Sequence, residues 1–429
     1  MSRSQIALLI VLLVCLITTG RQVHTPNLAD FQVYDTAAAV ARAHGGSHIY
    51  DGADTGTDPQ LRFATETTLY AHAARGLGIP RLRLYVYPPV LADMLIPFSL
   101  VPATEGGRWW LAANVAALLL IAALTTQMLR LPWVSLGSLG VLIGLFALFS
   151  TVMCLIWGQI TILLLLLLTA AILCYLRGWH TAAAFMLALA TVIKLTPLLV
   201  VAPLFCWCEW RLLRAYAGWL AVTGLLICVV NSPASLVDYF LHVMPSMSSA
   251  LPNFENKSLL SSIQLLYVTL HGGDAASVSI EVPLLLIRLG KLCSLLLVMA
   301  AVGCVARFGR QMQLPDRAMT LALFALISTC VSPVSWKHAY ILSFVALALL
   351  WSNALRRPLT PMHLALLTLC SIELGSFVFD QVAIKLTHGV GAGLASMLAP
   401  VAGIVLVFTT LLQMRPGAVA ATHEEAPSA

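Results

Sequence analysis

Charged residues are scarce in this chain of 429 residues: only 10% are Asp, Glu, Lys or Arg, whereas 60% are hydrophobic. Soluble domains carry about 25% charged residues, so the composition excludes an ordinary soluble protein. Apolar runs at residues 136–157, 160–176 and 283–305 approach or exceed the roughly 17–25 residues that cross a bilayer as a helix. These runs do not alternate between apolar and polar residues, which argues against a barrel of strands. The sequence therefore predicts an integral membrane protein of the all-α class.

Several motifs of soluble enzymes are also absent. The chain has no glycine-rich nucleotide loop, no nucleophile elbow and no HExxH motif. Its ten cysteines include no CxxC pair and lie within or beside apolar runs, so we interpret them as small buried or lipid-facing residues. His44 and His48 have the spacing of metal ligands on a helix, but Gly45 and Gly46 interrupt that helix. We therefore expect no metal site and no cofactor.

Basic residues indicate the orientation of the chain in the membrane. The net charge of +6 is modest and comes largely from short loops, which argues against a nucleic-acid partner. Arg307, Arg317, Arg356 and Arg415 mark loops or ends on the cytoplasmic side, because such loops are enriched in Lys and Arg. Counting helices back from them places "SPVSWKH" on the outer side. Arg211 and Arg214 mark another inner loop, so the helix near 216–231 places the long loop at about 232–282 outside. An inner amino terminus places the long loop at about 20–84 outside as well.

The whole of residues 1–420 is predicted to form one membrane domain with roughly 11–13 transmembrane helices, followed by a disordered tail at 421–429. The topology between residues 105 and 215 stays open, because its basic residues do not fit one simple count. Residues 6–19 could be the core of a signal peptide, but no small-x-small cleavage site follows them. An uncleaved first helix is the favoured interpretation.

Two acidic residues lie near the start of the first outer loop. Asn27 can cap a helix over about 28–44, and a second helix is expected at about 61–76. Asp30 is a candidate for chemistry, although its charge would also favour the first turn of a helix. Asp35, one turn later, could simply be solvated.

Lys194, in "LATVIKLTPLLV", is the most unusual charge in the chain. A lysine within an apolar run costs roughly 2.5–3.5 kcal/mol on insertion scales, so it is a functional candidate by default. Its side chain could instead extend along the helix to the membrane interface. Pro197 could break the helix and leave the ammonium group facing an anion.

Other candidates are polar residues at the ends of apolar helices. Gln159 in "IWGQITILLLLLL" could bond a ligand hydroxyl or join two helices. Tyr87 in "YVYPPVLADMLIP" lies at a helix entrance, where interfacial structure alone would explain it. "SPVSWKHAYILSF" places Lys337 and His338 together, and the pair could bind a phosphate. "NFENKSLL" contributes Lys257, which is also compatible with an ordinary loop.

In order along the chain, "DFQVYDTAAAVARAHGGSHIYD", "YPPVLADMLIPFSLVP", "GQITILLLLLL", "IKLTPLLVVAPL", "NKSLLSSIQLL" and "SPVSWKHAYILSF" resemble glycosyltransferase family 87 of the GT-C superfamily. The resemblance covers roughly residues 25–350. It implies a GT-C-type fold and a polyprenyl-phosphate sugar donor, with mannose the commonest donor sugar. It further implies an active site on the outer face of the bacterial inner membrane.

The resemblance also assigns roles to residues. It makes Asp30 the catalytic base and His338 a catalytic residue at the acceptor or at the donor phosphate. Asp35 stands where relatives often have an aromatic residue, and it leaves a second candidate base. Lys337 stands where relatives are often acidic, so the local charge is reversed. The proposed donor-phosphate ligands are Lys194, Lys337 and Lys257, and the proposed substrate-binding residues are Asp35, Tyr34, Gln159, Tyr87, Asn256 and Trp336.

These assignments predict transfer of a hexose with inversion, because one base supports a single displacement. The expected partners are the lipid-linked donor, a glycolipid or glycan acceptor and membrane lipids. A polytopic transporter of a lipid-linked or small anionic substrate is the main alternative, since a lysine within a membrane helix and proline-broken helices also mark transport pathways. A protein with only a structural or assembly role is a third possibility.

Overall fold

Helices form nearly all of the regular structure in the computed structural model, which describes residues 1–21, 25–51, 67–79, 82–231, 233–250, 252–273, 280–386 and 390–414. Within these ranges no strand is present, and an isolated β-bridge joins Asn256 to Trp336.

The elements of the first half are α1 (Arg3–Gly20), α2 (Ala29–His44), η1 (Gly45–His48), α3 (Leu69–Gly76), α4 (Pro89–Met94), η3 (Phe98–Leu100), α5 (Ala103–Met128), α6 (Leu136–Ala147), α7 (Phe149–Trp157), α8 (Thr161–Leu176), α9 (His180–Ile193), η4 (Thr196–Val201) and α10 (Ala202–Cys206). Those of the second half are α11 (Trp210–Val230), α12 (Pro233–Asp238), the π-helix η5 (Tyr239–Val243), α13 (Met244–Met247), α14 (Leu259–Leu270), α15 (Leu284–Phe308), η6 (Gly309–Gln311), α16 (Leu314–Val331), η7 (Lys337–Ser343), α17 (Phe344–Arg356), α18 (Pro361–Ser376), α19 (Val378–Leu386), α20 (Val390–Ser396) and α21 (Leu398–Gln413).

Seven helical segments of the described residues are long and apolar enough to cross a bilayer: α1, α5, α11, α15, α16, η7 with α17, and α20 with α21. The pair α6 and α7, bent by 57° at its junction, would make an eighth. The predicted all-α polytopic class is therefore confirmed. The count of 11–13 spans additionally needs shorter apolar helices such as α8, α9 and α14 to cross the membrane, and it stays a prediction.

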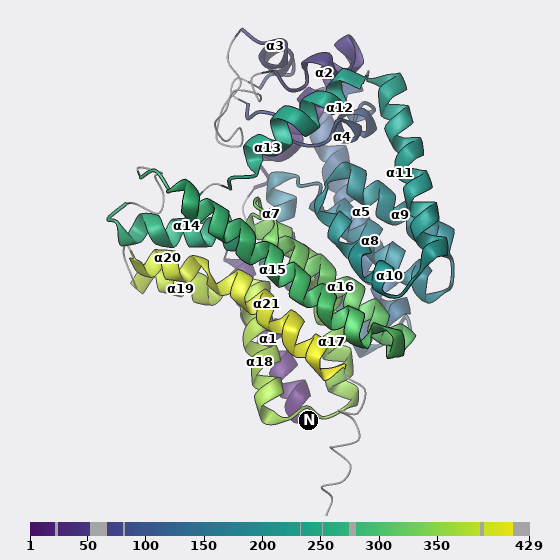
Figure 1. The fold of residues 1–429 in the computed structure, drawn as a ribbon, viewed down its shortest axis with the longest axis vertical. Coiled ribbons are helices and arrows are strands. Elements are labelled where there is room, and N and C mark those ends of the chain that lie inside the picture. Colours follow the sequence, from purple (N-terminus) through teal and green to yellow (C-terminus); the bar gives the residue numbers. More distant parts are fainter. Residues whose placement is uncertain are drawn as a thin grey trace, which may run out of the picture.

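The helices lie in two groups (Figure 1). Helices α5, α8, α9 and α11 pack side by side in one group, and α1, α16, α18 and α21 pack in the other. Helix α16 also contacts α8 and η4, so it connects the two groups. Helices α2, α4 and α12 lie together at the end opposite the amino terminus. The loop elements are thereby gathered over one end of the bundle.

Helix α2 begins one residue later than predicted and ends where expected. The prediction that Asn27 caps it is wrong: Leu28 occupies the N-cap position with a φ of 50°, and no side chain caps the helix. The Asn27 side chain accepts a hydrogen bond from the Ala29 backbone N–H at 3.2 Å, and Gly45 adopts a positive φ of 65° at the other end. The apolar face formed by Phe31, Tyr34, Ala38 and Ala41 is buried. Residues on other faces are buried as well, because α3, α4 and α5 pack around the helix. Helix α3 covers the end of the helix predicted at 61–76, and residues 61–66 lie outside the described ranges.

The start of α2 is fixed against the corner between α7 and α8. Gly158 occupies this corner with a φ of 69°, and a Cβ atom there would lie 2.8 Å from the Phe31 Cβ atom. The Trp110 indole donates to the Gly158 carbonyl at 2.8 Å and stacks on the Phe31 ring. The Leu28 backbone N–H donates to the Ile156 carbonyl at 2.9 Å. The corner therefore requires glycine for both its backbone angle and its space.

Gly158→Ala should lower the thermal unfolding temperature in detergent more than Gly178→Ala does. Both glycines have positive φ, so each alanine carries a cost of about 1–2 kcal/mol for the left-handed backbone. Only Gly158 also has a close neighbour, because nothing lies within 4 Å of a Cβ atom at Gly178. Equal shifts for the two variants would show that the contact with Phe31 is unimportant.

Candidate active site

A cavity of about 1260 Å³ lies where the two groups of helices meet the loop elements. Its wall comes from the start of α2, the segment before α4, the corner between α7 and α8, the break between α9 and η4, and the turn before η7. The predicted residues that line it are Asp30, Tyr87, Gln159, Lys194, Trp336, Lys337 and His338. Segments far apart in the sequence therefore contribute to one site.

Asp30 is held by a chain of hydrogen bonds. The Gln159 side-chain N–H donates to the Asp30 carboxylate, and the Tyr34 hydroxyl donates to the other end of the Gln159 amide at 3.2 Å. The Tyr34 hydroxyl also lies 3.1 Å from that of Tyr87. Tyr34 is buried and does not line the cavity, so its contact with the site runs through Gln159 and Tyr87.

Burial raises the pKa of Asp30 to about 6, and the hydrogen bond from Gln159 and the positive charges of Arg83 and Lys194 oppose this rise. The carboxyl group is thus ionised at neutral pH and is a stronger base than an exposed aspartate. Arg83 lines the cavity as well, and no pattern in the sequence singles it out.

Asp35, the competing acid, lies elsewhere. It is fully buried, neither carboxylate oxygen has a hydrogen-bond partner among the described residues, and it does not line the cavity. Of its two aspartates, the helix therefore turns Asp30 and not Asp35 toward the cavity.

Lys194 reaches the cavity through the helix break that Pro197 predicted. Helix α9 ends at Ile193, Lys194 adopts an extended conformation, and η4 starts with Pro197 in its first turn. The Lys194 ammonium group lies 6.0 Å from the centre of the Tyr87 ring. It is therefore directed into the cavity near Tyr87, and Asp30 is close enough for its charge to act on it.

The turn that carries His338 is fastened to the loop before α14. The Lys257 backbone N–H donates to the Ser335 carbonyl at 2.7 Å, and that of Lys337 donates to the Glu255 carbonyl at 3.2 Å. Asn256 adds side-chain bonds, accepting from the Ser335 N–H at 2.9 Å and donating to the Pro333 carbonyl at 3.0 Å. Asn256 thus holds the two loops together and does not line the cavity.

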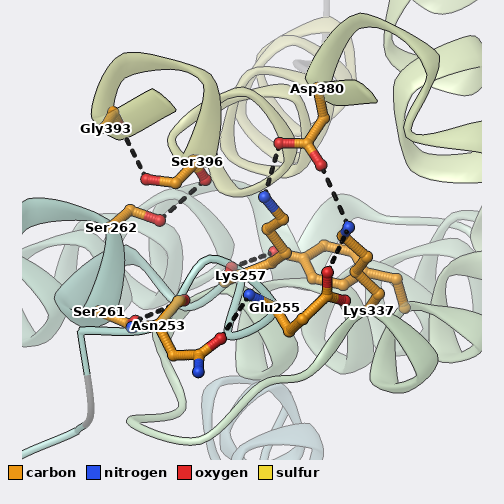
Figure 2. A network of polar contacts seen from close by, with 10 residues as sticks. Asn253, Glu255, Lys257, Ser261, Ser262, Lys337, Asp380, Gly393 and Ser396 are labelled. Carbon is orange, nitrogen blue, oxygen red and sulfur yellow. Dashed lines mark hydrogen bonds and ion pairs between the residues drawn. The ribbon is translucent and has the colours of Figure 1, made fainter. Parts of the chain in front are cut away.

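Lys257, predicted to bind the donor phosphate, is not brought to the cavity. Its ammonium group forms a fully buried ion pair with Asp380 at 2.5 Å (Figure 2). Burial lowers the pKa of Lys257 to about 8, while Asp380 opposes the shift. Removing one partner of a buried pair costs about 3–5 kcal/mol, so this pair is a structural requirement. Asp380 and Glu255 were not singled out from the sequence.

The described residues contain no group of three His, Cys, Asp or Glu side chains arranged to hold a metal ion. The charged groups that face the cavity are instead the carboxylates of Asp30 and Glu255 and the basic groups of Arg83, Lys194 and Lys337. The basic groups of such a site can bind an anionic ligand, and a carboxylate beside them can take a proton from a second ligand.

The sequence model of glycosyltransferase family 87 matches residues 85–333, which is more than half of the chain. The match includes Tyr87, Gln159 and Lys194. Asp30 lies before it and His338 after it. A comparison with curated proteins finds no match.

Gln159→Leu should raise the pKa of Asp30 above its present value of about 6, because the lost hydrogen bond favours the ionised carboxylate. Infrared titration can follow the carboxyl band that disappears in Asp30→Asn. Gln264→Leu is the matched control, since Gln264 is also buried but bonds the Ser249 carbonyl away from the cavity. An unchanged or lower pKa in Gln159→Leu would contradict the assigned role of Gln159.

Proposed function

The chain belongs to glycosyltransferase family 87 and is a multi-pass membrane glycosyltransferase, and from this premise we propose the details of its reaction. It moves a hexose, with mannose as the first candidate, from a polyprenyl-phosphate donor to a glycolipid or glycan acceptor. The reaction takes place at the outer face of a bacterial inner membrane. The observation that carries this proposal is one cavity shared by Asp30 and by the basic residues Lys194 and Lys337.

The apolar part of the cavity supports a lipid-linked donor. Its apolar lining includes Leu198, Leu199, Val201, Ala202, Phe205, Met244 and Met247. These residues come from η4, α10 and α13, next to the break that exposes Lys194. A polyprenyl chain can pack against them while its phosphate lies beside the ammonium group, because both kinds of surface meet there.

Asp30 acts as the general base. An acceptor hydroxyl is a poor nucleophile, and a carboxylate that takes its proton during attack on the anomeric carbon typically speeds the step about 10²–10⁴-fold. Gln159 holds the carboxylate in place, and Tyr34 holds Gln159. The burial of Asp35 away from the cavity favours Asp30 over Asp35 as the base.

The basic residues stabilise the leaving group. The polyprenyl phosphate gains negative charge as the glycosidic bond breaks, and fixed positive groups lower the energy of that state. Lys194 and Lys337 are the proposed phosphate ligands, and His338 acts beside them at the donor phosphate or the acceptor. Tyr87 and Trp336 are proposed to contact the sugar, since both line the cavity.

A single displacement with one base inverts the configuration at the anomeric carbon and forms no covalent sugar–protein intermediate. The acceptor hydroxyl loses its proton to Asp30, the new glycosidic bond forms, and the bond to the phosphate oxygen breaks.

Asp30→Asn should reduce sugar transfer by at least about 100-fold, because the amide cannot accept the acceptor proton. The assay uses purified protein in detergent, a labelled polyprenyl-phosphate mannose and a lipid extract as acceptor source. Asp35→Asn is the matched control and should retain most activity if it folds, since Asp35 does not face the cavity. Wild-type turnover in Asp30→Asn with an inactive Asp35→Asn would move the base to Asp35.

The pH profile should follow the titration of Asp30. Below its pKa of about 6 the carboxyl group is protonated and cannot act as a base. The value of kcat/KM should therefore fall about tenfold for each pH unit below that point and level off above it. Gln159→Leu should move the acid limb to higher pH. A wild-type rate that rises as the pH falls from 7 to 5 would be incompatible with this base.

A further inference from the structure

Lys337 lies between two carboxylates with different surroundings (Figure 2). Its ammonium group is 3.0 Å from the carboxylate of Glu255 and 3.5 Å from that of Asp380. The Glu255 side chain is 55% exposed and lines the cavity, whereas that of Asp380 is completely buried. A ligand in the cavity can therefore reach one of the two carboxylates and not the other.

Asp380 is fixed from behind the cavity wall. It lies in the first turn of α19 and pairs with Lys257 at 2.5 Å. The Phe254 ring lies between the two lysines, with its centre 3.5 Å from the Lys257 ammonium group and 4.7 Å from that of Lys337. The buried Asp380 carboxylate and the Phe254 ring thus hold the Lys337 ammonium group from the side away from the cavity.

The Glu255 carboxylate is not needed to join the two loops. Their backbones are linked by the bond from the Lys337 N–H to the Glu255 carbonyl and by the bond from the Lys257 N–H to the Ser335 carbonyl. Asn256 adds its side-chain bonds to the same junction. The Glu255 side chain can therefore leave Lys337 while the loops stay in register.

We propose that Glu255 is the resting partner of Lys337, and that the phosphate of the lipid donor replaces its carboxylate when the donor binds. Asp380 is the positioning residue that keeps the Lys337 ammonium group at the cavity wall during this exchange. This inference rests on the proposed function, because it takes a polyprenyl phosphate as the ligand. Two lysines then share one fixed carboxylate, and the phosphate supplies the missing negative charge.

The test measures binding of undecaprenyl phosphate, without a sugar, to the full chain in nonionic detergent. Trp157 and Trp336 line the cavity, so quenching of tryptophan fluorescence can report the binding. Glu255→Gln removes the competing carboxylate and should tighten binding about threefold. Glu281→Gln is the matched control: Glu281 is an exposed acid outside the cavity, and this variant should bind like the wild type. Unchanged or weaker binding in Glu255→Gln would overturn the exchange.

Asp380→Asn should weaken binding at least about tenfold, because Lys337 loses its fixed partner. The double variant Lys257→Gln with Asp380→Asn separates positioning from simple charge balance, since it leaves no unpaired Lys257. It should bind as weakly as Asp380→Asn. Recovery of wild-type affinity in the double variant would show that Asp380 only neutralises Lys257.

A transfer assay on the same samples separates this inference from the proposed function. Lipid-phosphate binding in the expected order without sugar transfer by the wild type would reject the proposed reaction and keep the exchange. Transfer by the wild type with no tighter binding in Glu255→Gln would reject the exchange alone. Failure of the wild type to bind undecaprenyl phosphate would overturn the exchange.

Discussion

The cost of removing a charge from water governs this structure more than any other interaction. Within an apolar bundle, an ionised group must have a partner of opposite charge or face a polar cavity. The chain uses both solutions within a short distance of each other. Asp30 and Lys194 face the cavity, whereas Lys257 and Asp380 neutralise one another behind its wall. Lys337 links the two arrangements, because it lines the cavity and lies 3.5 Å from Asp380.

The position of Asp30 depends on close packing as much as on charge. The start of α2 sits on the corner at Gly158, where the Cβ atom of Phe31 fits because no side chain is present. The next residue along the chain, Gln159, then donates to the Asp30 carboxylate. One turn of backbone therefore sets both the approach of α2 and the hydrogen bond on the base. The Asp30 carboxylate, on a helix outside the candidate membrane spans, is thereby held in one position.

Local patterns in the sequence predicted the fold class and singled out several of the residues that line the cavity. The apolar runs predicted the class, Gly45 marked the end of α2, and Pro197 predicted the break that directs Lys194. The start of α2 was predicted to within one residue, although Leu28 and not Asn27 occupies the cap position. What the sequence could not supply was long-range pairing. Lys257 and Asp380 are 123 positions apart, so nothing near either residue shows that the lysine is neutralised. Glu255 and Arg83 had no local signal, because an acid or a base in an outer loop is ordinary until the fold brings it to a cavity.

The choice between Asp30 and Asp35 shows where helix geometry adds to such patterns. Successive residues of an α-helix turn by about 100°, so five positions separate the two carboxylates by roughly 140° around the axis. If one of them faces a cavity beside the helix, the other is directed to a different neighbour. The Asp35 side chain of α2 is surrounded by protein. Its carboxylate has no hydrogen-bond partner among the described residues. The same rotation that gives Asp30 its access to the cavity thus removes its competitor from it.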